Sequence, residues 1–341
     1  MNLRLPQPDR ARWQTELAQA YRDPRVLLRA LDLDPEPYLA GFAAGASFPT
    51  LVPRPFAARM RPGDPDDPLL RQVLPIADEG LAAPGFVADP LAEQAGARPG
   101  LLHKYRSRVL VILRGGCAIN CRYCFRRHFP YGDHALASGA LAEIVAYVAA
   151  RPEVDEVILS GGDPLLAKDA DLAAVIEALR GLPQLRRLRI HTRLPITLPS
   201  RITPALVDLL GGAPWPTVVV FHTNHARELD AEVDAALAEL RGAGVTLLNQ
   251  SVLLRGVNDS VEALAELSER LLKAGVLPYY LHLLDRVAGA AHFEVGEDRA
   301  RALVAGLYRT LPGFLVPRLV REIAGEPSKV PIDLGLEPAS G

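Results

Sequence analysis

All three cysteines of this chain lie within eight residues, in the run Cys117-Ala-Ile-Asn-Cys121-Arg-Tyr-Cys124. Thiolates at such spacings are ligands of iron–sulfur clusters, and a four-iron cluster can use four of them. Because the chain has no fourth cysteine, a cluster held here would keep one iron free of protein sulfur. An open iron can bind a small molecule and react with it. The spacing therefore favours a reactive cluster over one that only carries electrons.

Two structural alternatives stay open for this loop. His128 follows Cys124 at a spacing typical of zinc fingers, so a closed zinc site with three cysteines and one histidine also fits. A disulfide is a weaker alternative, because an odd number of tightly clustered thiols argues for a metal. Arginines 122, 126 and 127 surround the loop and suit an anionic cluster and an anionic ligand better than a structural zinc.

Length and composition indicate a globular protein. The 341 residues are 49% hydrophobic, enough for one large core with an appendage or for two domains. A net charge of -2 gives no electrostatic reason to expect nucleic-acid binding, and no apolar run is long enough to cross a membrane. The first eight residues contain no apolar signal core, which together with the clustered thiols predicts a cytoplasmic location.

Lysine is rare in this chain. Of 38 basic residues only four are lysines, at positions 104, 168, 273 and 329. Only a primary amine can form a Schiff base, so a lysine kept in an arginine-rich chain is a candidate for covalent catalysis. Lys273 has a simpler explanation, because it falls in the last turn of an expected helix.

The elements that must position these residues change character along the chain. Residues 1–100 show short amphipathic stretches between proline-rich turns and predict a helical N-terminal extension. From Arg108 onward, apolar runs alternate with helical periods. Strands are expected at 109–113, 156–159, 188–190, 217–221, 245–249 and 279–284, with helices at 141–150, 170–179, 203–210, 230–242 and 261–274.

Six strand–helix units in succession predict an α/β fold, a partial (β/α)6 barrel related to the TIM barrel. A doubly wound open sheet is the alternative, but no GXGXXG turn follows the first strand. The expected domains are the extension at 1–100, the (β/α)6 core at 101–290 and a C-terminal segment at 291–341.

The polar motifs follow the expected strands, where parallel α/β folds collect their reactive groups. The cysteine loop comes after the first strand and the turn Ser160-Gly161-Gly162-Asp163 after the second. This turn offers backbone groups and a carboxylate to an amino-acid-like ligand. The same sequence is also typical of an ordinary strand-to-helix turn with an N-cap.

Together these motifs resemble the radical S-adenosylmethionine (SAM) superfamily, and within it the lysine 2,3-aminomutase family. Further matching motifs lie at residues 102–105, 249–259, 278–280 and 326–329, and the likeness runs from about residue 20 to near the C-terminus. It is greatest to the short branch that makes β-lysine for modification of elongation factor P. The resemblance implies a radical SAM fold and an isomerase that uses a [4Fe–4S] cluster, SAM and pyridoxal 5′-phosphate (PLP).

The resemblance also implies roles for single residues. The cluster ligands would be Cys117, Cys121 and Cys124. Lys329 would be catalytic and bind PLP covalently, and Lys104, Tyr105 and Arg108 would also hold PLP. The residues near SAM would be Ser160, Gly161, Gly162, Asp163, His222 and Gln250, and the substrate residues would be Arg126, Asp285 and Glu322. Burying two carboxylates in one pocket without a cation costs free energy, so Asp285 and Glu322 together predict a cationic substrate. Local sequence alone would instead make Lys329 a surface lysine and pair Glu322 with a neighbouring arginine.

The expected reaction is therefore the conversion of L-lysine into β-lysine. The expected partners are L-lysine, a reductant such as flavodoxin or ferredoxin, an elongation factor P lysyl-ligase that takes the product, and further copies of this chain in a homo-oligomer. Lys104 and Glu322 stand where the longer family members carry arginine and aspartate, which favours the short branch. The alternatives are an aminomutase acting on free lysine or glutamate, and a zinc-binding interaction module without catalysis.

Overall fold

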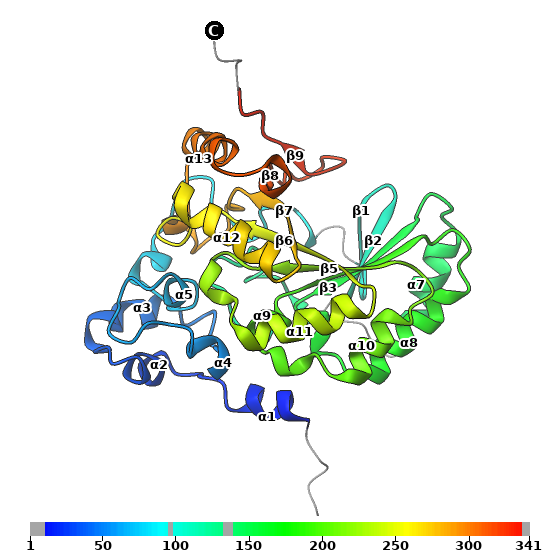
Figure 1. Ribbon diagram of the computed structural model, residues 1–341, viewed down its shortest axis with the longest axis horizontal. Helices are drawn as coiled ribbons and strands as arrows, with labels where there is room; N and C mark the ends of the chain where they lie inside the picture. Colours follow the sequence, from blue (N-terminus) through cyan, green and yellow to red (C-terminus); the bar gives the residue numbers. More distant parts are fainter. Residues whose placement is uncertain (1–10, 95–97, 132–138, 336–341) are drawn as a thin grey trace, which may run out of the picture.

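The computed structural model describes residues 11–94, 98–131 and 139–335. The first eight residues, in which no apolar signal core was expected, lie outside them. The described residues form one sheet of nine strands, in the same order as in the sequence (Figure 1). Neighbouring strands from β2 to β8 run parallel, and β1 and β9 pair antiparallel at the two edges. The sheet is a partial barrel, which confirms the predicted α/β fold class.

The strands and helices have the following bounds. The strands are β1 (Leu101–Tyr105), β2 (Arg108–Arg114), β3 (Glu156–Gly161), β4 (Arg187–Thr192), β5 (Thr217–His222), β6 (Thr246–Val252), β7 (Leu277–His282), β8 (Arg318–Arg321) and β9 (Val330–Pro331). The helices outside the N-terminal extension are α7 (Ala140–Ala149), α8 (Asp169–Arg180), α9 (Leu194–Thr197), α10 (Pro204–Gly211), α11 (Ala231–Gly242), α12 (Val261–Lys273) and α13 (Glu297–Thr310).

The predicted alternation of strands and helices is confirmed, and the parallel part is longer by one strand. All six expected strands are present as β2 to β7, and the five expected helices as α7, α8, α10, α11 and α12. Strands β1, β8 and β9 and helix α13 were not predicted. In β1, the residues His103-Lys104-Tyr105 lack the apolar alternation that predicts a strand. Strands β8 and β9 are only four and two residues long, too short to show a periodic pattern.

The helix starts explain why the chain turns where it does. Helix α11 begins after Asp230, whose carboxylate accepts a hydrogen bond from the backbone N–H of Val233. Helix α12 begins in the same way after Ser260. Side-chain caps of this kind satisfy backbone donors that have no partner inside the helix. They end each strand-to-helix loop at a defined residue and so help to shape the mouth of the barrel.

The N-terminal extension packs against the cysteine loop. Its helices α1 (Arg12–Ala18), α2 (Pro24–Ala30), α3 (Leu39–Ala44), α4 (Arg54–Ala57) and α5 (Pro68–Arg71) lie beside the barrel, in blue in Figure 1. Ile119 belongs to the extension's hydrophobic core, whereas Trp13 of α1 belongs to the core of the barrel. The two parts therefore share their interior, and the division at residue 100 stays a prediction, as does the one at 290.

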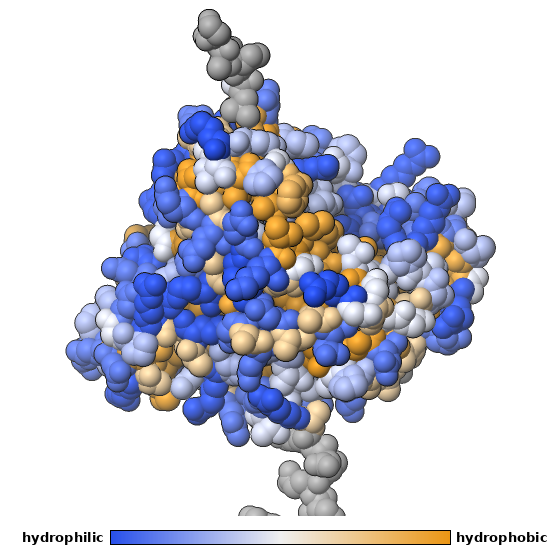
Figure 2. All heavy atoms as spheres, in the orientation of Figure 1, coloured by the Kyte–Doolittle hydropathy of each residue, from blue (hydrophilic) through white to orange (hydrophobic). Residues whose placement is uncertain are grey.

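Polar residues cover most of the face in Figure 2, with apolar side chains between them. None of the helices in the described part of the chain is both long enough and apolar enough to cross a membrane.

Candidate active site

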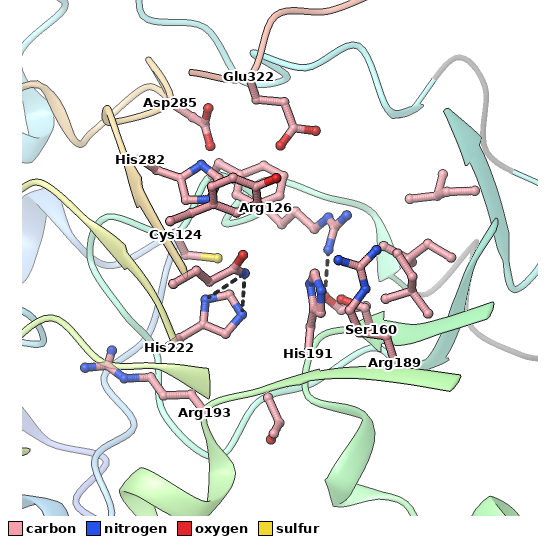
Figure 3. A pocket seen from close by; sticks show the side chains of 18 of the residues that line it. Cys124, Arg126, Ser160, Arg189, His191, Arg193, His222, His282, Asp285 and Glu322 are labelled. Atoms are coloured by element: carbon pink, nitrogen blue, oxygen red, sulfur yellow. Dashed lines mark hydrogen bonds between the residues drawn. The ribbon is translucent and has the colours of Figure 1, made fainter. Parts of the chain in front are cut away.

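One cavity of about 480 Å³ runs from the carboxyl ends of the parallel strands along the inner face of the sheet to the starts of β2, β3 and β4 (Figure 3). Every residue that the sequence singled out for the site lines it: Cys117, Cys121, Cys124, Lys104, Tyr105, Arg108, Arg126, Ser160, Gly161, Gly162, Asp163, His222, Gln250, Asp285, Glu322 and Lys329. Strand-end loops of a parallel sheet point to the same side, which is why segments far apart in sequence meet here.

The glycine turn after β3 is fastened to the start of the cysteine loop. The backbone N–H of Asp163 donates to the carbonyl oxygen of Gly116 at 2.7 Å. A Cβ atom added at Gly162 would lie 2.1 Å from that same oxygen, and Gly161 has a φ of +111°. A side chain at Gly162 would push the two loops apart, so this close approach requires glycine.

The cysteine sulfurs suit a metal cluster. Burial, and then the charge of its neighbour Cys121, raises the pKa of Cys124 to about 11; burial also raises the pKa of Cys117 well above its usual value. Crowded thiols that resist ionisation on their own become thiolates when a metal supplies positive charge. All three are free cysteines, so no disulfide forms between them.

A mononuclear zinc site does not match this arrangement. Among the described residues, no three His, Cys, Asp or Glu side chains are placed to hold a single metal ion. The exposed His128, the expected fourth ligand, instead has its Nε2 3.1 Å from the carbonyl oxygen of Ala288. Three free cysteines that line one cavity suit a [4Fe–4S] cluster, which is held by cysteine thiolates.

The carboxylate of Asp163 is hydrogen-bonded within the protein. It is buried and accepts hydrogen bonds from the Thr192 hydroxyl at 2.7 Å and from the backbone N–H groups of Arg193 at 2.8 Å, Leu194 at 2.9 Å and Leu165 at 3.0 Å. Its expected place near SAM stays a prediction. Asp163 positions the glycine turn and the start of α9, and the backbone of the turn faces the cavity.

Glu322, at the end of β8, is the counter-ion of two of the four lysines. Its carboxylate lies 2.6 Å from Lys104 Nζ and 2.6 Å from Lys329 Nζ, and accepts a hydrogen bond of 2.8 Å from the Tyr105 hydroxyl. Burial pushes the pKa of Glu322 upward, but Lys329 and Lys104 hold it well below its usual value. Glu322 therefore pairs with lysines, and its neighbour Arg321 pairs with Glu297 instead. The expected contact of Glu322 with a substrate ammonium stays a prediction.

Cationic side chains of β2 and β4 also line the cavity. The guanidinium of Arg108 lies 4.1 Å from the centre of the Tyr105 ring. Arg187 and Arg189 were not predicted, although a signal existed: residues two apart on β4 point to the same face. Arg189 pairs with Glu156 at 2.9 Å, and its buried Nε has no hydrogen-bond partner among the described residues. Such a cluster fits a phosphate group, including that of PLP.

Arg126 is already paired by a residue of the N-terminal extension. Its Nε and Nη2 lie 2.7 Å and 3.0 Å from the two carboxylate oxygens of Glu93, and Nη1 points to the Gly161 carbonyl oxygen at 3.3 Å. Lys104 Nζ is 3.5 Å from the same carboxylate. Glu93 was missed because a separation of 33 residues leaves no local pattern.

Asp285 differs from Glu322 because it has no hydrogen bond or ion pair from the side chains that the structure describes. Burial first, and then the charge of Glu322, raises its pKa to about 7. Nearby, burial lowers the pKa of His222 to about 3, so this imidazole is neutral, and its Nε2 lies 3.0 Å from Gln250 Nε2 (Figure 3). The cavity thus offers one carboxylate without a partner and neutral polar groups below it.

Comparison with known proteins places this arrangement in a family. A model of the radical SAM superfamily matches residues 111–268. The L-lysine 2,3-aminomutase of Escherichia coli (strain K12) is 54% identical, over 97% of this chain and 97% of its own length. The enzyme of the same name from Haemophilus influenzae is 48% identical over 93% and 94%, and that from Buchnera aphidicola 43% over 99% and 100%. This chain belongs to the lysine 2,3-aminomutase family.

A solved radical SAM methyltransferase from Sphaerobacter thermophilus is also similar, with a TM-score of 0.45 and 20% identity over 65% of this chain and 68% of that one. Membership of the lysine 2,3-aminomutase family makes the protein an isomerase and implies a [4Fe–4S] cluster, SAM and PLP as its cofactors. The cavity has a group for each of them: three sulfurs, the glycine turn in its wall, and two lysines beside a cationic cluster.

Proposed function

We propose that this protein is a PLP-dependent radical SAM 2,3-aminomutase that converts L-lysine into β-lysine for the post-translational modification of elongation factor P. The observation that carries the proposal is the convergence, in one cavity, of the three cysteines, the lysine pair on Glu322 and the unpaired Asp285. Support also comes from relatives named L-lysine 2,3-aminomutase that match nearly the whole chain.

The cofactor residues divide by chemistry. Cys117, Cys121 and Cys124 would hold the cluster, and the amine of Lys329 would bind PLP. When bound, the cluster supplies the electron that splits SAM into a carbon radical, and PLP supplies a conjugated ring for the migrating nitrogen. Glu322 holds the Lys329 amine in place. Tyr105 keeps its proton, because burial and the charge of Glu322 raise its pKa.

The substrate residues select a cationic amino acid. Arg126 would turn its Nη1 side to the substrate carboxylate, and Asp285, which has no ion pair among the described side chains, would receive the distal ammonium. Glutamate would place a second carboxylate against Asp285, which costs free energy in a buried site. These charges favour lysine over glutamate as substrate.

The rest of the protein would orient the substrate and keep other hydrogen donors away. A radical reaction depends on positioning more than on acid–base steps. Glu93 brings the N-terminal extension into the cavity wall beside Arg126, and both side chains are largely buried. The extension therefore closes one side of the site.

The proposed setting follows from the same function. The protein would work in the cytoplasm as a homo-oligomer, accept electrons from a flavodoxin or a ferredoxin, and pass β-lysine to an elongation factor P lysyl-ligase. It would bind neither nucleic acid nor a membrane. Amino-acid analysis of the group released by hydrolysis from elongation factor P, with β-lysine separated from α-lysine by chromatography, tests the last step. Loss of β-lysine is expected in cells without this gene.

The central experiment is an anaerobic assay of the reconstituted, reduced protein with SAM, PLP and either L-lysine or L-glutamate. We expect β-lysine from lysine and no β-isomer from glutamate. Lys329→Ala should lose covalently bound PLP while keeping iron and sulfide. A colourless wild-type protein with about one zinc and no sulfide would overturn the proposal, and β-glutamate as the main product would overturn its substrate.

A further inference from the structure

A buried arginine lies directly behind the cysteine loop and has no part in the chemistry described so far. Arg193 follows β4 and is 6% exposed. Its Nη1 donates to Cys121 Sγ at 2.7 Å and to the Tyr123 hydroxyl oxygen at 2.8 Å. The Tyr123 hydroxyl is also hydrogen-bonded to Cys121 and accepts a bond of 2.7 Å from the Asn224 side chain. A small network of donors therefore ends on one cysteine sulfur.

Arg193 is held in this position from three directions. Its Nη2 donates to Gln72 of the N-terminal extension at 2.6 Å and to Glu228 at 2.9 Å. Its backbone N–H donates to Asp163. Glu228 is fully buried, so moving the guanidinium away would leave a carboxylate without its cation. The geometry at Cys121 is therefore built into the fold and does not depend on a flexible side chain.

We propose that Arg193 sets the reduction potential of the iron–sulfur cluster through its hydrogen bond to Cys121 Sγ. The inference rests on the proposed role of Cys121 as a cluster ligand. Reduction places an electron on the cluster and makes its sulfurs more negative. A charged donor at a ligand sulfur stabilises the reduced state more than the oxidised state, and so raises the potential. Arg193 is a tuning and positioning residue and does not touch the substrate.

Glu228 makes the effect directional. The Arg193–Glu228 pair has no net charge, but its positive end faces the sulfur and its negative end faces away. Removing the donor should lower the potential, and removing the negative charge behind it should raise it. Cys124 Sγ receives its hydrogen bond from the backbone N–H of Arg126, which stays the same in every side-chain variant.

The test is an anaerobic redox titration of the reconstituted holoprotein, followed by the EPR signal of the reduced cluster, with iron and sulfide measured on each sample. The variants are Arg193→Lys, Glu228→Gln and the double variant Arg193→Met/Glu228→Gln, which removes the donor without leaving a buried charge unpaired. Arg201→Lys is the matched control. Arg201 is also buried, but it donates to Leu165 O, Ala167 O and Asp169, not to a sulfur.

We expect Arg193→Lys and the double variant to reduce at least about tenfold less favourably than wild type, which is about 59 mV for one electron. Glu228→Gln should shift the potential upward, and Arg201→Lys should leave it unchanged. Equal potentials in wild type and the double variant would overturn the inference, as would a downward or absent shift in Glu228→Gln. If Arg193→Lys does not fold, the double variant decides. A wild-type protein without iron and sulfide would instead refute the proposed cluster itself.

Discussion

Asp285 changes its charge near neutral pH. Burial raises its pKa to about 7, and the charges of Glu322 and Glu93 contribute to the rise. The charges of Lys329 and Lys104 act in the opposite direction and lower the pKa. A carboxyl group with this pKa is largely neutral in mild acid and ionised in mild base. Only the ionised form attracts the distal ammonium of lysine.

The affinity for lysine should therefore rise as the pH increases through about 7. In Asp285→Asn that part of the pH dependence should vanish, and the KM for lysine should increase by roughly 10- to 100-fold, as expected when a charged hydrogen bond is lost. Steady-state kinetics at several pH values measure both effects. The substrate amine titrates equally in both proteins, so only the difference between their profiles counts. Parallel profiles would show that Asp285 does not bind the ammonium.

Glu93 fixes the plane of the Arg126 guanidinium by two hydrogen bonds and leaves Nη1 toward the glycine turn. Glu93→Gln keeps the side-chain size but loses one charge-assisted bond. We expect the KM for lysine to rise by roughly 10-fold with kcat little changed, because the carboxylate receptor loses its orientation. A lower KM would mean that Glu93 competes with the substrate for Arg126.

At the scale of elements, a buried cluster of three charges joins the extension to the cysteine loop. Arg122 and Arg127 both pair with Glu79, at the turn Ala77–Gly80, and both guanidinium groups lie about 5 Å from the Phe48 ring. The three charged side chains are almost fully buried. Removing one member of such a cluster leaves uncompensated charge in the interior.

Glu79→Ala should lower the free energy of unfolding by about 3–5 kcal/mol. Glu177→Ala is the control, because Glu177 forms an exposed pair with Arg180, whose loss should cost about 0–1 kcal/mol. Chemical denaturation followed by circular dichroism measures both. Equal losses in the two variants would show that the buried cluster does not hold the loop in place.

At the scale of the whole molecule, the cysteine loop is anchored by apolar packing as well as by any metal. Ala118 packs into the barrel core and Ile119 into the core of the extension, and Tyr123 lies against Phe293. The fold therefore has many contacts that do not need iron. A small zinc module has few of them and unfolds when its metal is removed.

Removal of iron with a chelator under oxidising conditions should abolish the iron–sulfur absorption and SAM cleavage while the circular dichroism spectrum and a cooperative thermal transition persist. The same sample should regain absorption on reconstitution with iron and sulfide. Loss of the helical signal together with the iron would contradict this expectation, and would mean that the cluster is part of the folding core.

The sequence by itself determined the parts of this protein that depend on neighbours a few residues away. The cysteine spacing and the glycine turn are short motifs of neighbouring residues. The alternation of strands and helices from β2 to α12 is visible in the sequence because strand and helix faces repeat over two to four residues. These local patterns were sufficient to place the cysteine loop and the glycine turn after adjacent strands.

Only the tertiary structure decided which charges meet. Arg126 and Glu93 are 33 residues apart, Arg193 and Cys121 are 72 apart, and Lys104 and Glu322 are 218 apart. No local pattern links such residues. The curvature of the sheet brings the strand ends together, and burial then selects the pairs, because a buried charge needs a partner wherever in the chain that partner lies.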